Sequence, residues 1–170
     1  MSSLYLGCAL CEVDAEGNVL LADTMARTLG LPAPEEPLFL STHERDQCLV
    51  GYARSHLQEI RTRTERWRLA DEDAGRDAQR HHERMRRLFG IVEVAPRSEQ
   101  GLMLPAVMRH LGRIESMALI VGTGDRFEIW NPRLAVTHVD GRFRELASWQ
   151  VMHRRAPRAG GPDPARGRVR

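Results

Sequence analysis

The chain contains two related halves, and this internal repeat restricts its fold more than any other feature of the sequence. When Gly17–Leu31 is laid over Gln100–Ile114, a shift of 83 residues, apolar positions coincide along both segments. Leu38–Thr42 then falls on Leu119–Thr123 at a slightly different shift. A solenoid needs at least ~3 repeats to bury a continuous core. Two copies therefore predict a face-to-face pair, a pseudo-dimer within one chain.

Each half is expected to be rich in short strands, because brief apolar runs lie between turn residues. Gly17 closes the first turn, where it can adopt a left-handed conformation at little cost. Gly122 and Gly124 mark a hairpin turn in the second half. The predicted strands are Leu4–Val13, Val19–Leu21, Leu38–Leu40, Cys48–Val50, Leu102–Leu104, Ala118–Val121 and Phe127–Trp130.

A pair of helices is expected between the two β-rich halves. Apolar residues recur at helical spacing from Ala53 to Trp67 and again from Ala78 to Phe89, with arginine and glutamate on the other faces. Asp71-Glu72-Asp73 is expected to interrupt the first helix, and Gly90 to end the second. The charged faces of this hairpin favour contact with solvent over contact with a partner.

The charge distribution is uneven. The formal net charge is +2, and all 25 basic residues are arginine. The absence of lysine is chain-wide and fits the codon usage of a GC-rich genome, so it does not establish a basic binding surface. Residues 154–170, rich in Arg, Pro and Gly, predict a disordered tail that either attracts phosphates or only keeps the chain soluble. With no secretory signal or membrane-spanning segment recognised, we expect a cytoplasmic protein without membrane partners.

No catalytic or metal motif is recognised in the sequence. Cys8 and Cys11 have a C-x-x-C spacing, but a structural zinc site needs a second pair of ligands, and residues three apart on a strand point to opposite faces. With Cys48 they make an odd number of cysteines, which argues against a disulfide framework. We therefore expect small buried thiols, no cofactor, no metal and no enzymatic activity.

From about Gly7 to Arg133 the chain resembles the MraZ family, double SpoVT/AbrB-type transcriptional regulators of the division and cell-wall gene cluster. The resemblance is carried by the order β-module, helical hairpin, β-module and by short motifs in the same order. These are Asp14-Ala15-Glu16-Gly17-Asn18, Arg87-Leu88-Phe89-Gly90, the run Leu102–Arg109 and Phe127-Glu128-Ile129-Trp130.

Both copies of the family's D-x-x-x-R signature are altered. Asn18 stands where the first arginine is expected, and the second copy has Arg97 and Gly101 in place of Asp and Arg. Ala22 replaces a family proline. Because asparagine carries no charge, the strongest phosphate contact of the first turn is lost. This change affects the expected DNA affinity more than the expected fold.

The resemblance implies an α+β fold of two swapped-hairpin AbrB-like β-modules, a pseudo-dimer joined by a helical hairpin. The implied segments are module 1 at 4–52, the hairpin linker at 53–90, module 2 at 91–134, a C-terminal segment at 135–153 and the disordered tail at 154–170. We expect the hairpin turns of both modules to gather on one face as a composite cationic edge.

The resemblance also implies a ring-like homo-oligomer in the nucleoid that binds direct repeats in promoter double-stranded DNA. For each candidate arginine, exposure to solvent or bracing of a turn is the alternative to DNA contact, and Arg109 in particular is expected to brace the short helix against the first turn. The rival function is a degenerate family member that acts as an antitoxin-like or hetero-oligomeric protein-interaction module. The candidate DNA-binding residues are Asp14, Asn18, Arg27, Arg45, Arg109 and Arg126.

Overall fold

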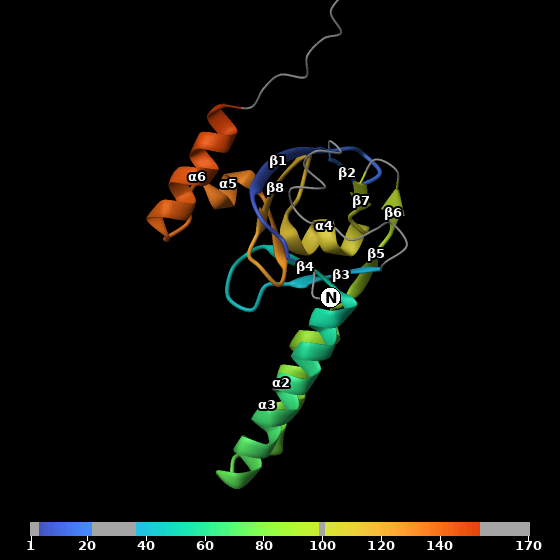
Figure 1. Ribbon diagram of the computed structural model, residues 1–170, viewed down its shortest axis with the longest axis vertical. Coiled ribbons are helices and arrows are strands. Elements are labelled where there is room, and N and C mark those ends of the chain that lie inside the picture. The colour runs from blue at the N-terminus through green and yellow to red at the C-terminus, as the bar shows by residue number, and fades with distance from the viewer. Residues whose placement is uncertain (1–3, 22–36, 99–100, 154–170) are drawn as a thin grey trace, which may run out of the picture.

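The computed structural model describes residues 4–21, 37–98 and 101–153, and within these ranges it is a mixed α+β fold (Figure 1). Arg27 and the tail 154–170 lie outside the described residues. The strands are β1 (Cys8–Val13), β2 (Asn18–Leu20), β3 (Leu38–Thr42), β4 (Leu49–Ala53), β5 (Glu93–Ala95), β6 (Arg97–Ser98), β7 (Gly101–Met103), β8 (Met117–Gly122) and β9 (Phe127–Trp130). The helices are α2 (Arg54–Asp73), α3 (Ala78–Phe89), α4 (Ala106–Gly112), α5 (Pro132–Ala135) and α6 (Gly141–Met152).

The nine described strands form one antiparallel sheet in which the two halves of the chain alternate. The order is β5-β3-β4-β9-β8-β1-β2-β7-β6. The pairs β3–β4, β8–β9, β1–β2 and β6–β7 join strands of the same half. The pairs β3–β5, β4–β9, β1–β8 and β2–β7 join strands of different halves. Only Pro96 separates β5 from β6, the two ends of this order, so the sheet curls nearly into a barrel.

The main core fills the inside of this curled sheet with side chains from both halves. Val19, Leu40, Leu102 and Ile120 are fully buried there, and Met108 of α4 enters the same cluster. Fully burying an aliphatic side chain of this size stabilises a fold by about 1.5–3 kcal/mol. Because each half supplies part of one common core, each half depends on the other for burial.

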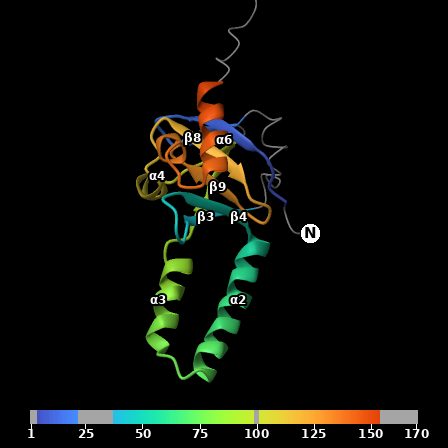
Figure 2. The same cartoon turned by 90° about the vertical axis from the view of Figure 1, so that its left-hand side faces the viewer.

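Helices α2 and α3 lie side by side and project from the sheet as an arm (Figure 2). The base of the arm packs on the sheet through Ile60, Leu57, Leu88 and Phe89, which contact Tyr52 and its neighbours. Farther out the arm is held by polar contacts, and no residue of α3 is buried. The arm is therefore an extension of β4 and β5 with little core of its own.

Helices α5 and α6 cover another side of the sheet, against β8 and β1. Trp130 and Phe143 pack with ring centroids 4.9 Å apart in a second apolar cluster that includes Ala147. Among the described helices, none combines the length and the apolar character that a bilayer crossing requires.

Two expectations about local structure differ from what is observed. Asp71-Glu72-Asp73 does not interrupt the first helix, since α2 continues through Asp73. Asp71 accepts hydrogen bonds from Arg76 and Arg84 at 2.8 and 3.2 Å, and this pairing compensates an acidic residue near the helix C-terminus. The apolar face predicted from Ala53 to Trp67 is also buried only in part, because Ile60 is buried but Trp67 at its outer end is 38% exposed.

Candidate nucleic-acid interface

The turn between β1 and β2 is built around Asp14 and Asn18. The backbone and side-chain amides of Asn18 donate to the two carboxylate oxygens of Asp14 at 2.7 and 2.8 Å. The side-chain hydrogen bond from Asn18 is the main reason why the pKa of Asp14 lies below its usual value. Gly17, at φ +97°, supplies the left-handed conformation that the turn needs. Asn18 thus preserves the turn of the D-x-x-x-R signature while leaving it without a cation.

Arg109 of α4 fastens the second half of the chain to this turn. Its Nη1 donates to the carbonyl oxygen of Ala15 at 2.8 Å. Its aliphatic stem packs against Gly17, and its Cδ lies 3.2 Å from the position that a Cβ on residue 17 would occupy. The bracing contact expected for Arg109 is therefore present in the structure.

Helix α4 ends beside an open hollow of about 700 Å³ that is mostly basic. Gln47 of the β3–β4 loop donates to the carbonyl oxygen of Leu111 at 2.8 Å and joins that loop to the helix. Arg109, His110 and Arg113 line the hollow together with one acid, Glu115. His110 and Arg113 were not predicted from the sequence, although Arg113 follows Arg109 by four residues and ends α4 as its C-cap.

Arg45 and Arg126 lie on either side of His43, although they come from different halves. Arg126 Nη2 is 3.3 Å from His43 Nε2, and the backbone amide of Arg45 donates to His43 Nδ1 at 3.2 Å. Arg45 is exposed, and within the described part of the chain its guanidinium has no ion-pair partner. Arg126 is half-buried, with Glu128 also 3.9 Å from His43.

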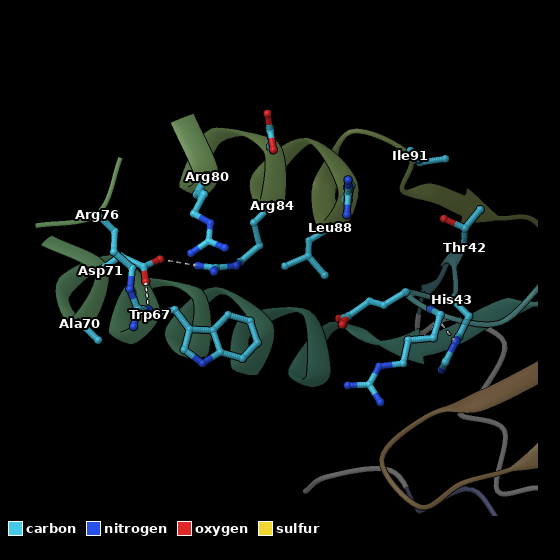
Figure 3. Close-up of a pocket in the computed structure, with 14 residues that line it drawn as sticks. Thr42, His43, Trp67, Ala70, Asp71, Arg76, Arg80, Arg84, Leu88 and Ile91 are labelled. Atoms are coloured by element: carbon cyan, nitrogen blue, oxygen red, sulfur yellow. Dashed lines mark hydrogen bonds and ion pairs between the residues drawn. The ribbon is translucent and has the colours of Figure 1, made fainter. Parts of the chain in front are cut away.

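A second hollow, of about 640 Å³, separates the arm from the β3–β4 loop (Figure 3). Trp67 forms part of its wall, with the guanidinium of Arg84 5.1 Å from the ring centroid. Arg76 and Arg84 are committed to Asp71, as the dashed lines in Figure 3 show. The arginines that line this hollow are Arg45, Arg76, Arg80, Arg84 and Arg87, beside the acids Glu44, Asp71 and Glu83.

Only part of the expected composite cationic edge is present in the described residues: the β3–β4 loop and the β8–β9 turn meet where Arg126 contacts His43, whereas the β1–β2 turn lies apart from the connection into β7. Asn18 pairs with Met103 and Leu20 pairs with Gly101, so the turn before β2 and the connection into β7 lie at opposite ends of this strand pair. An antiparallel pairing of two equivalent strands places their turns apart in this way. The first turn is also acidic, because it contains Asp14 and Glu16. The expected residues instead form two clusters, Asp14–Asn18–Arg109 and Arg45–His43–Arg126.

The cysteines are free thiols without features of a reactive site. Burial raises the pKa of Cys8 to about 11 and that of Cys11 to about 12. Burial also raises the pKa of Cys48. All three thiols are therefore protonated at neutral pH, whereas a nucleophilic or metal-binding cysteine is a thiolate.

One group of three described side chains lies close enough to hold a metal ion. The group consists of His56 and Glu59 on α2 and Asp125 in the β8–β9 turn, with ligand atoms all within 4.8 Å of one another. This group was not predicted from the sequence.

Comparison with known proteins supplies the class of function. No protein-family model matches the chain. Curated proteins named transcriptional regulator MraZ are similar to most of it. The protein of Lactiplantibacillus plantarum is 26% identical over 119 residues, 69% of this chain and 75% of its own length. The protein of Cytophaga hutchinsonii is 28% identical over 124 residues, 73% and 77% of the two chains. The protein of a Thermoanaerobacter species is 26% identical over 138 residues, 79% and 88%.

Proposed function

The chain belongs to the MraZ family, and on that basis we propose that it regulates transcription by binding double-stranded promoter DNA. The observation that carries this proposal is the similarity to transcriptional regulators along more than two thirds of the chain. The family resemblance further suggests direct repeats in the division and cell-wall gene cluster as the target. The protein would then act in the cytoplasm, at the nucleoid, and without catalysis.

We assign the phosphate contacts to the hollow beside α4 and to the adjoining β3–β4 loop. Arg45 and Arg113 are both exposed, and within the described residues neither guanidinium is held by a carboxylate. Exposed guanidinium groups that no carboxylate holds are well suited to bind phosphate oxygens, because they donate paired hydrogen bonds and remain charged. Arg109 acts as a positioning residue through its bond to Ala15. Arg126 has the same role through its contact with His43.

The remaining candidates have smaller parts in this proposal. Asp14 and Asn18 fix the shape of the first turn, and Asn18 contributes at most a neutral hydrogen bond to DNA. Arg27 is proposed as a further phosphate contact, and the Arg-rich segment 154–170 as a source of sequence-independent attraction.

The sheet order supports a pseudo-dimer as the binding unit. The counterparts in the two halves are β2 and β7, β3 and β8, β4 and β9, and β1 and the interrupted strand β5/β6. If each strand is replaced by its counterpart, the order of neighbours around the near-barrel stays the same. A unit with this symmetry presents two related surfaces to DNA. If copies of the chain assemble into a ring, as in the family, each weak contact is repeated on successive DNA repeats at high effective concentration. This multivalency compensates for the charge missing at position 18.

A DNA-binding titration of the full chain tests the proposal. We expect a double-stranded promoter fragment with direct repeats to be bound with an affinity that falls steeply with salt, as phosphate contacts require. Arg45→Ala and Arg113→Ala should each weaken binding and flatten the salt dependence by about one unit of slope per lost contact. Arg66→Ala is the matched control, since Arg66 is exposed on α2 and does not line the hollow beside α4. Equal DNA binding by the wild-type chain and all three variants would contradict the assignment of phosphate contacts to this surface.

A protein-interaction module is the second candidate function. Two observations favour it: the acidic first turn, and the apolar side chains exposed on α6, where Trp149 is 53% and Met152 73% exposed. A protein partner or another copy of the chain could cover these side chains. This function predicts a stable complex with protein and no preference for repeat DNA over unrelated DNA.

A further inference from the structure

His56, Glu59 and Asp125 converge where the arm meets the sheet. His56 and Glu59 are three residues apart on the first turns of α2, so their side chains lie on one face of the helix. Asp125 comes from the turn between β8 and β9, in the other half of the chain. His56 Nδ1 lies 3.2 Å from Asp125 Oδ2 and 3.7 Å from Glu59 Oε2.

The histidine is buried without a hydrogen bond to any described residue. Its side chain is only 5% exposed, and within the described part of the chain neither ring nitrogen has a hydrogen-bond partner, although Nδ1 faces the two carboxylates. Tyr52 packs against the ring with centroids 5.2 Å apart. A buried nitrogen without a hydrogen-bond partner normally costs about 1–3 kcal/mol, so a native structure that keeps one usually has a use for it.

The orientation of the histidine suits a metal ligand. Nδ1 is the ring nitrogen that faces the carboxylates of Asp125 and Glu59, so an ion between the three groups would meet one nitrogen and two oxygens. Histidine binds metals through such a nitrogen as the neutral imidazole.

We propose that His56, Glu59 and Asp125 bind one divalent transition-metal ion that ties the arm to the β8–β9 turn. One imidazole nitrogen and two carboxylate oxygens form a donor set that suits zinc and its neighbours. With metal–ligand bonds of about 2.0–2.2 Å, neighbouring ligands of a tetrahedral site lie ~3.4 Å apart. The observed separations of 3.2 and 3.7 Å bracket that spacing.

The surroundings allow an ion to enter and leave a place for water. The side chains of Glu59 and Asp125 are 59% and 53% exposed. Asp125 and His56 also line a hollow of about 410 Å³, together with Arg63, Arg126 and other residues. Water completes the coordination from this side. The two arginines near the site reduce its attraction for cations, so binding rests on direct coordination by all three ligands.

The function of the ion in this proposal is mechanical. The arm continues directly from β4, and the described apolar contacts that hold it to the sheet lie near its base. A metal bound to α2 and to the β8–β9 turn adds a second attachment close to Arg126, one of the candidate DNA-binding residues. The ion thereby fixes the arm relative to the sheet and restrains the turn that carries Arg126.

Titration of the metal-free full chain with Co²⁺, followed by competition with Zn²⁺, tests the site. We expect one equivalent of Co²⁺ to bind with visible d–d absorption and without the near-ultraviolet charge-transfer band that thiolate ligands produce. Glu59→Gln and Asp125→Asn should each weaken binding by about tenfold or more. Both residues are exposed, so these variants are expected to fold, which circular dichroism checks; His56→Asn serves as a third variant.

The matched control uses histidine–carboxylate contacts outside this group. Asp46 lies 3.4 Å from His138 Nε2 and 3.3 Å from His43 Nδ1, but among the described residues only His56, Glu59 and Asp125 bring three ligand atoms within 4.8 Å of one another. Asp46→Asn should therefore leave metal affinity unchanged. Failure of the wild-type chain to bind Co²⁺ or Zn²⁺ would overturn the proposal. Unchanged affinity in Glu59→Gln and Asp125→Asn, or a thiolate band that places the ion on cysteines, would overturn it as well.

Discussion

Val19 of β2 lies directly opposite Leu102 of β7, the residue that stands 83 positions later in the same place of the second half. Both side chains are fully buried. A pairing of equivalent residues in an antiparallel pair is what the proposed pseudo-dimer requires. This pairing connects the repeat in the sequence to the alternation of the halves in the sheet.

Because of this alternation, we predict that neither half forms a folded monomer alone. A fragment that ends at Ala53 keeps the pairs β1–β2 and β3–β4, but each of these four strands loses its partner from the other half. It should be unfolded, or it should dimerise by pairing its strands with those of a second copy. Sedimentation and circular dichroism distinguish these states. A folded monomeric fragment would contradict the interleaved architecture.

The repeat, the helical hairpin and several strands could be predicted from the sequence because their signals are local. Phe127–Trp130 matches β9 in full, and Gly17 adopts the expected left-handed turn. The continuation of α2 through Asp73 could not be predicted, since it depends on Arg84, a residue of the next helix, reaching Asp71. The separation of the β1–β2 turn from the connection into β7 follows from the antiparallel register of β2 and β7. This register pairs equivalent positions of the two repeats, and composition alone does not reveal it.

The candidate site was predicted only in part for the same reason. Arg109 bracing the first turn was expected from the family motif and is observed. The cluster of His56 and Asp125 was not, because these residues are far apart in the chain and meet only where β9 pairs with β4.

Gly17→Ala should destabilise the fold more than Gly124→Ala does. Both glycines have positive φ, at +97° and +93°, so both substitutions introduce backbone strain. At Gly17 the new Cβ would also stand 2.6 Å from the carbonyl oxygen of Leu104, whereas at Gly124 no atom of a described neighbouring residue lies within 4 Å. We expect a loss of about 1 kcal/mol at Gly124 and about 2–4 kcal/mol at Gly17, measured by urea denaturation. Similar losses at the two positions would show that the contact with Leu104 is not restrictive.

Asp71→Asn should lower the free energy of unfolding at neutral pH and reduce the loss of stability in acid. Hydrogen bonds from Arg76 and Arg84 lower the pKa of Asp71 in the folded chain. Its carboxylate therefore stabilises the fold fully above the unfolded pKa, about 4, and loses this effect as the pH falls through the lower folded value. Denaturation curves at pH 7 and at pH 3 measure the difference.

Asp73→Asn is the control for this prediction, because Asp73 lies on the same helix but is exposed. It should change stability little at either pH. If the two variants had the same pH dependence, the Asp71 cluster would have no special part in holding the arm.

Asn18→Arg should raise the affinity for DNA by restoring the charge that the family signature carries at this position. One added phosphate contact steepens the dependence of log affinity on log salt by about 0.9. Asn18→Gln, which keeps an uncharged amide, is the matched control. Fluorescence anisotropy with labelled duplex at several salt concentrations gives both quantities, and equal slopes for the two variants would mean that the first turn does not approach the phosphates.

The central claim, that the chain is a sequence-selective DNA-binding regulator, is tested most directly by comparing two duplexes of equal length at physiological salt. One carries direct repeats from the chain's own promoter region and the other carries the same bases in scrambled order. We predict clearly tighter binding to the repeats, with several copies of the protein on each duplex. Equal affinity for both duplexes, or no binding to either, would contradict the claim and favour the protein-interaction function.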